Sequence, residues 1–74
     1  MEKFISDFAN QLLDQNEDGL TPATVFRDLD DWDSLTAMAV IAMVQDNYNV
    51  KIDEGEFKKL RTIDDLYQYV QKNK

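Results

Sequence analysis

The tripeptide Asp33-Ser34-Leu35 is the part of this chain whose residue types point most directly to a chemistry. Ser34 opens an apolar run with helical periodicity, straight after the acidic stretch 28–33. The first backbone N–H groups of a helix lack partners within the helix, so a phosphate attached to a serine there would be favoured. The chain has no His and no Cys, which excludes the Ser–His and Cys–His pairs of nucleophilic enzymes. We therefore expect another enzyme to modify Ser34, which then carries a cargo.

The helix that positions Ser34 is predicted over residues 35–47, with Ser34 as its first helical residue and the hydroxyl pointing outward. Asp33 is the expected N-cap, because a carboxylate there accepts hydrogen bonds from first-turn N–H groups and suits the positive helix end. Helical spacing then gives the residues expected to be buried, which are Val40, Ile41, Met43, Val44 and Tyr48.

Upstream, residues 2–14 form an amphipathic pattern that predicts a first helix, ended by a turn in which Gly19 can take a positive φ. Residues 20–33 are predicted to form a long connection, since Pro22 prevents a helix from running through its start. Because this connection is rich in apolar residues, we expect it to pack on the helices. The inward residues of the first helix are expected to be Phe4, Ile5, Phe8, Ala9, Leu12 and Leu13.

Downstream, two more helices are predicted from their caps. Asp53 and Glu56 have the spacing of a capping box that opens a short helix through Leu60, and Thr62 with Asp65 opens a last helix. The fold class is therefore all-α: a small bundle of three longer helices and one short helix with a long first loop, in one domain over residues 1–74. The last helix is expected to bury Ile63, Leu66, Tyr67 and Val70.

Composition narrows the class of function. Fifteen acidic residues against eight basic ones give a net charge of −7, which argues against nucleic-acid binding. No run is long enough to span a membrane, and no charged-then-apolar leader is apparent. We expect a monomeric cytoplasmic protein without membrane insertion, whose acidic surface attracts partners with basic patches. The absence of Cys fits a reducing compartment.

Several segments together resemble the acyl carrier proteins. They are Asp33-Ser34-Leu35 with the helix behind it, then residues 48–52 and residues 62–65. The likeness extends over essentially the whole chain, and the helix order and the long first loop agree with it. The tripeptide alone would be a weak motif, but its spacing to the downstream segments is fairly specific.

The resemblance implies a function without catalysis. A phosphopantetheinyl transferase would use coenzyme A and Mg²⁺ to attach 4′-phosphopantetheine to Ser34, and acyl groups would ride on the arm as thioesters. Asp33 and Leu35 would flank the attachment site. No metal-ligating residue is predicted from the sequence, and weak binding of divalent ions by the clustered carboxylates stays open. The implied partners are that transferase and acyl ligases, synthases and transferases with basic and apolar docking patches. A discrete carrier for fatty-acid or specialised acyl or polyketide-type biosynthesis is expected.

The sequence departs from the family pattern beside Ser34. Asp31 stands where the family usually has Gly, and the second helix lacks acidic residues on its expected exposed face. An apolar strip of Leu35, Met38, Ala39 and Ala42 is expected there instead, from spacing i, i+3, i+4, i+7. Docking is therefore predicted to rest on apolar contact and loop charge. The predicted partner-binding residues are Asp28, Asp30, Asp31, Leu35, Met38 and Ala39.

Other interpretations stay open. The same arm serves aminoacyl, D-alanyl and peptidyl carriers, so the sequence does not separate these from acyl carriers. In a different class, Ser34 could be an unmodified helix-start residue of an acidic interaction domain. Residues 14–19 match the opening of a calcium-binding EF-hand loop, but the twelfth position, which requires a bidentate Glu, is Val25. The lone Trp32 is expected to be a core or lid residue rather than a docking residue.

Overall fold

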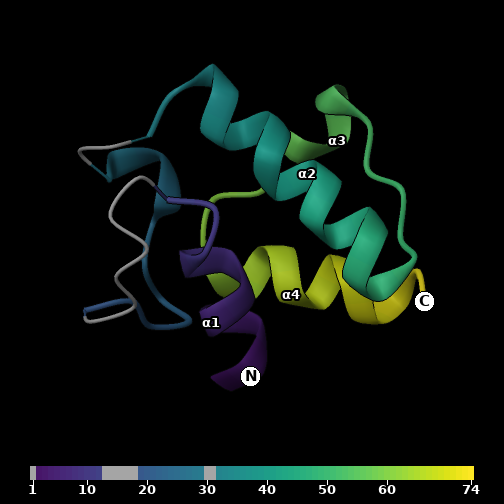
Figure 1. Ribbon diagram of the computed structural model, residues 1–74, viewed down its shortest axis with the longest axis horizontal. Coiled ribbons are helices and arrows are strands. Elements are labelled where there is room, and N and C mark those ends of the chain that lie inside the picture. The colour runs from purple at the N-terminus through teal and green to yellow at the C-terminus, as the bar shows by residue number, and fades with distance from the viewer. Residues whose placement is uncertain (1, 13–18, 30–31) are drawn as a thin grey trace.

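The computed structural model describes residues 2–12, 19–29 and 32–74, and within these ranges the protein is all-helical (Figure 1). The helices are α1 (Glu2–Ala9), the 3₁₀ helix η1 (Phe26–Asp28), α2 (Ser34–Tyr48), α3 (Glu54–Phe57) and α4 (Ile63–Lys72). The predicted class and helix order are thus confirmed. No helix of the described ranges has the length and hydrophobicity needed to cross a bilayer.

The core lies between α1, α2 and α4. Phe4 of α1 contacts Tyr48 of α2 and Tyr67 of α4, with ring centroids 5.4 Å apart in both pairs. In Figure 1, α4 crosses below α2, and the C-terminal ends of the two helices converge on the side where the chain ends. Side chains at or below 2% exposure fill the centre, and the largest are Phe4, Phe8, Phe26, Val40, Val44, Val50, Ile63, Leu66 and Val70.

The first helix is shorter than predicted. It ends at Ala9, because the N–H groups after Asn10 bond three residues back. Gln11 N–H donates to the Phe8 carbonyl and Leu12 N–H to the Ala9 carbonyl, each at 3.0 Å. These tighter turns keep Leu12 in the core, at 7% exposure. Gly19 has the expected positive φ, at 84°. Leu13 and the rest of the predicted helix lie outside the described residues.

The long connection packs on the bundle as expected, but it also contains η1, which was not predicted. Its backbone pairs with the start of α4: Phe26 N–H donates to the Arg61 carbonyl at 3.2 Å, and Ile63 N–H donates to the Thr24 carbonyl at 3.1 Å. An isolated antiparallel bridge joins Val25 and Thr62. These bonds connect residues 35 or more positions apart, so no local sequence pattern predicts them.

The helix caps follow the sequence closely. Thr62 and Asp65 form the complete predicted capping box of α4. At α3 the predicted capping box forms only in part. Asp53 Oδ1 accepts from Glu56 N–H at 2.8 Å, but the Glu56 carboxylate lies 3.6 Å from Lys59 Nζ instead of reaching back to Asp53 N–H. The helix ends at Phe57 rather than Leu60, since the N–H groups of the last two residues, Lys59 and Leu60, bond to carbonyls three positions back.

Candidate functional site: the serine that opens α2

Ser34 is the first residue of α2 and its side chain is exposed, as predicted. Asp33 precedes it in an extended conformation, and Asp33 Oδ1 accepts a hydrogen bond from Thr36 N–H at 2.8 Å. Asp33 is therefore the N-cap. The hydrogen bonds from Thr36 N–H and Leu35 N–H hold the pKa of the Asp33 carboxyl below its usual value, although slight burial opposes them. The cap thus keeps its negative charge at the positive end of α2.

Ser34 also lines a cavity between α2 and α3, with a volume of about 430 Å³. A hydroxyl on this rim faces both solvent and a sheltered space, so a group attached to it can reach either. The apolar part of the lining comes from both helices and the preceding loop, through Trp32, Ala37, Met38, Ile41 and Phe57.

The apolar strip beside Ser34 is present. Leu35 and Met38 are the exposed large hydrophobic residues among those described, at 76% and 59% exposure. Ala39 is half-buried next to them and Ala42 is exposed. An apolar surface of this kind costs free energy when it faces water, so it suits a contact with another molecule.

The acidic loop is described only in part. Asp28 is exposed at the end of η1, whereas Asp30 and Asp31 lie outside the described residues. Residues 14–18, which are most of the segment that matches the opening of a calcium loop, also lie outside them. Trp32 is half-buried against the core and stacks on Phe8, with centroids 6.0 Å apart and planes 5° apart. The predicted packing role of Trp32 is confirmed.

Arg27 and Phe57 also line the cavity, and neither residue was predicted from the sequence in this role. Arg27 carried one signal that could have found it, since it is the single basic residue between Lys3 and Lys51. Phe57 carried none, because its residue type indicates only an ordinary core residue, and it is 4% exposed.

With this geometry in view, similarity to known proteins identifies the family. A family model described as "Phosphopantetheine attachment site" matches residues 3–70. This chain belongs to the acyl carrier protein family. Acyl carrier proteins are carriers and not enzymes, and their cofactor is 4′-phosphopantetheine. The lack of catalytic groups expected from the sequence agrees with this membership.

The curated relatives are distant and carry different names. An acyl carrier protein of Thermobifida fusca is 36% identical over 53 residues, which cover 72% of this chain and 67% of that protein. A meromycolate extension acyl carrier protein of Mycobacterium leprae is 38% identical over 53 residues, which cover 72% of this chain but only 46% of that protein. A polyketide-8 synthase acyl carrier protein of Streptomyces avermitilis is 27% identical over 66 residues, covering 89% of this chain and 79% of that one.

A solved structure agrees with the fold over nearly the whole chain. The solution structure of a holo acyl carrier protein from Geobacter metallireducens matches with a TM-score of 0.76 at 32% identity. The match covers 99% of this chain and 86% of that one. The family partners of such a carrier are a phosphopantetheinyl transferase and enzymes that process acyl groups.

Proposed function

We propose that this acyl carrier protein holds 4′-phosphopantetheine on Ser34 Oγ and carries acyl groups in fatty-acid or specialised acyl or polyketide-type biosynthesis, as a monomer in the cytoplasm. The observation that carries the proposal is the exposed Ser34 hydroxyl at the first position of α2, inside the segment that the family model matches. Residues 1–74 act as a single carrier domain. The supporting feature is the one core cluster that draws on every α-helix of the described chain.

The residues around Ser34 fit the prosthetic group. Ser34 Oγ is accessible and attacks the phosphorus of coenzyme A in the transferase, so that a Ser–O–P bond forms and the pyrophosphate bond breaks. The nucleotide bisphosphate leaves, and the hydroxyl proton passes to a base of the transferase. Once attached, the group supplies the thiol that this chain lacks. Asp33 holds the helix start in place through its bond to Thr36 N–H, and Leu35 is exposed beside it for contact with the transferase.

Partner docking uses two neighbouring features. Leu35, Met38 and Ala39 supply an apolar contact, and Asp28, Asp30 and Asp31 supply negative charge that speeds encounter with basic patches. The exposed fractions of Leu35 and Met38 support this arrangement. Because α2 lacks acidic residues on this face, we propose a specialised partner set. Full activity of the loaded protein as a substrate of a standard fatty-acid elongation enzyme would count against a specialised partner set.

The carrier function is tested by loading and release. The protein is incubated with a phosphopantetheinyl transferase and an acyl-coenzyme A, and its intact mass is followed before and after neutral hydroxylamine. We expect a gain of one acyl-phosphopantetheinyl group, followed by loss of the acyl group alone, because hydroxylamine cleaves a thioester to a hydroxamic acid and a free thiol. A protein that gains no mass would be the unmodified acidic interaction domain instead.

A further inference from the structure

We propose that the cavity beside Ser34 receives an aromatic acyl group, held against Trp32 and Phe57, and that the helix interior is closed to a long saturated chain. The proposal rests on the proposed attachment of the arm to Ser34. Because Ser34 itself lines the cavity, a group on a flexible tether at that position is present beside the cavity at high effective concentration.

The floor of the cavity is closed by aromatic rings. The ring centroid of Phe57 lies 6.2 Å from that of Trp32 and 5.5 Å from that of Phe26, with interplanar angles of 22° and 25°. Trp32 in turn lies 5.0 Å from Phe26 and stacks on Phe8. Phe8 and Phe26 are fully buried. A chain that entered the bundle from Ser34 would have to displace these rings, and packed cores resist inserted volume.

Arg27 ties the α3 wall to the loop. Its two terminal nitrogens donate to the carbonyl oxygens of Leu60, at 3.0 Å, and Phe57. Its guanidinium carbon also lies 5.2 Å from the ring centroids of both Phe26 and Phe57. Movement of α3 away from η1 would break two charge-assisted hydrogen bonds and these ring contacts. These contacts hold η1 against α3, so this wall of the groove beside Ser34 resists displacement.

A planar ring suits such a groove better than an extended alkyl chain. Trp32 is only half-buried, and aromatic rings gain from stacked or tilted contact with one another beyond the area that they bury. The apolar side chains of Ala37 and Ile41 line the same space. Arg27 and Lys58 add positive charge to the lining, which favours the electron-rich face of a ring, although Glu54 also contributes a negative charge.

The experiment compares four forms of the full-length carrier: the arm with a free thiol, and the arm carrying acetyl, benzoyl or dodecanoyl groups. Amide-linked coenzyme A analogues prevent hydrolysis, and intact mass confirms loading before each measurement. The readouts are Tm by circular dichroism and the emission of Trp32, the chain's single tryptophan. We expect benzoyl to raise Tm by about 4 °C over acetyl and to change Trp32 emission, while dodecanoyl behaves like acetyl.

A matched pair of variants localises the effect. Ala37→Gln places a longer polar side chain in the cavity lining and should remove the difference between benzoyl and acetyl. Ala23→Gln makes the same change at an exposed position outside the lining and should leave that difference intact. Each comparison is made between two loaded forms of one variant, so a general change in stability cancels.

Two results would overturn the inference. One is a Tm that rises steadily with the length of a saturated chain, which would mean that the chain enters the interior. The other is a benzoyl form that matches the acetyl form in both Tm and Trp32 emission, which would mean that the groove binds no cargo. Failure of wild-type protein to gain the arm at all would instead defeat the proposed function.

Discussion

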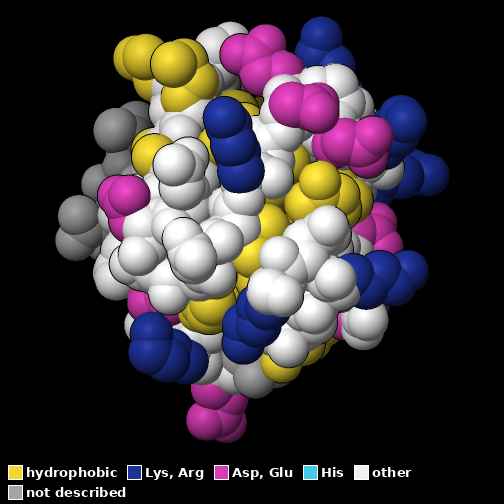
Figure 2. Space-filling view, turned by 90° about the vertical axis from the view of Figure 1, so that its right-hand side faces the viewer, with side chains coloured by type: hydrophobic (Ala, Val, Ile, Leu, Met, Phe, Trp, Pro, Cys, Tyr) yellow, Lys and Arg dark blue, Asp and Glu magenta, His cyan; other side chains and the backbone are white. Residues whose placement is uncertain are grey.

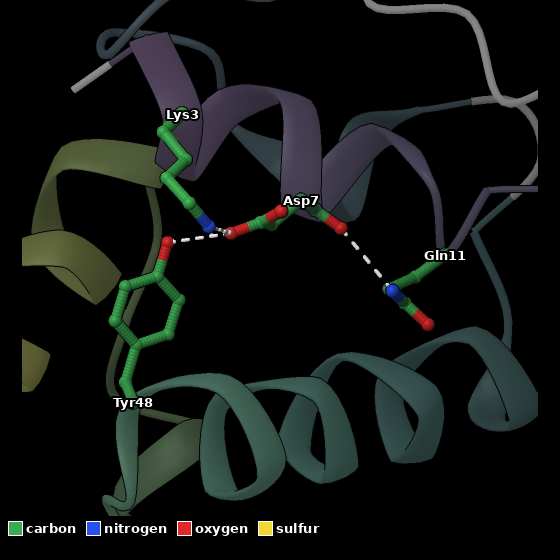
Figure 3. A network of polar contacts seen from close by, with 4 residues as sticks. All are labelled: Lys3, Asp7, Gln11 and Tyr48. Carbon is green, nitrogen blue, oxygen red and sulfur yellow. Dashed lines mark hydrogen bonds and ion pairs between the residues drawn. The ribbon is translucent and has the colours of Figure 1, made fainter.

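Asp7 connects two helices through a single carboxylate oxygen. Asp7 Oδ2 accepts a hydrogen bond from the Tyr48 hydroxyl at 2.7 Å and from Lys3 Nζ at 3.0 Å (Figure 3). Burial would raise the pKa of Asp7, but the bonds from Tyr48 and Lys3 outweigh it and the pKa is lowered. Burial and the bond to Asp7 raise the pKa of Tyr48. The contact therefore fastens α1 to the end of α2 as long as Asp7 is ionised.

Tyr48→Phe should lower the free energy of unfolding by about 1–2 kcal/mol, because it removes a hydrogen bond to a charged acceptor and leaves the ring packed. Urea denaturation measures the change. Tyr69→Phe is the matched control, since the Tyr69 ring is also half-buried and its hydroxyl bonds to no residue of the described ranges. Equal losses in the two variants would contradict the assigned role of the Tyr48 hydroxyl.

The lowered pKa of Asp7 also predicts a pH dependence. A carboxyl whose folded pKa lies below its unfolded value of 3.8 contributes stability above that value and loses it as the pH falls through the folded pKa. Between pH 5 and pH 2, Asp7→Asn should therefore lose less unfolding free energy than the wild type. Asp46→Asn, at an exposed position on α2, should follow the wild type. An Asp7→Asn curve parallel to that of the wild type would argue against this linkage.

Side-chain hydrogen bonds were predictable from the sequence where the two partners are close along the chain. In each helix cap the two partners are three residues apart, as in the pairs Asp33–Thr36 and Thr62–Asp65. Helix-start patterns predict such pairs. Arg27 bonds to carbonyls 30 and 33 positions away. Such contacts depend on the packed fold, so the residues near Arg27 in the sequence do not predict which carbonyls it reaches.

For the helices too, features set by local sequence were predictable and features set by tertiary packing were not. The order of the helices and the start of each predicted helix followed from caps and apolar spacing, whereas the ends of α1 and α3 did not. In both cases the chain leaves the helix through bonds to the third preceding carbonyl, which brings Leu12 and Leu60 against the core. The choice between a further helical turn and a tighter one is made by burial, which periodicity alone does not reveal.

The capping box of α4 is expected to carry a measurable share of stability. In the wild type, Asp65 N–H donates to the Thr62 hydroxyl at 3.0 Å. Thr62→Ala removes this acceptor and should lower the free energy of unfolding by about 1 kcal/mol. Thr62→Ser keeps the hydroxyl and should cost clearly less. Thermal denaturation of the two variants and the wild type gives the comparison, and equal Tm values for Thr62→Ala and the wild type would show that the cap is unimportant.

At the scale of the whole molecule, charge is unevenly distributed. Ten of the fifteen acidic residues precede residue 50, while six of the eight basic residues follow it. Figure 2, which views the side where the chain ends in Figure 1, shows Lys and Arg side chains spread among acidic ones on that face. The acidic excess therefore belongs to the part of the chain that contains Ser34, which suits encounter with basic partners.

The net charge of −7 also predicts a response to salt. Like charges on one small domain repel one another, and raising ionic strength from 0.01 M to 0.15 M shortens the screening length from about 30 Å to about 8 Å. Tm should therefore rise with NaCl over this range. The uncharged osmolyte sucrose serves as a control for general solute effects on the water around the protein. A Tm that falls with NaCl would mean that attractive ion pairs dominate.

The proposed function depends on attachment of the arm to Ser34 Oγ, and site-resolved mass spectrometry measures this attachment. Wild type, Ser34→Ala and Ser6→Ala, which changes the chain's other serine, are treated with coenzyme A and a phosphopantetheinyl transferase and then digested. We predict one phosphopantetheinyl group on the Ser34 peptide of the wild type and of Ser6→Ala, and none on Ser34→Ala. The same mass gain on Ser34→Ala would contradict the account.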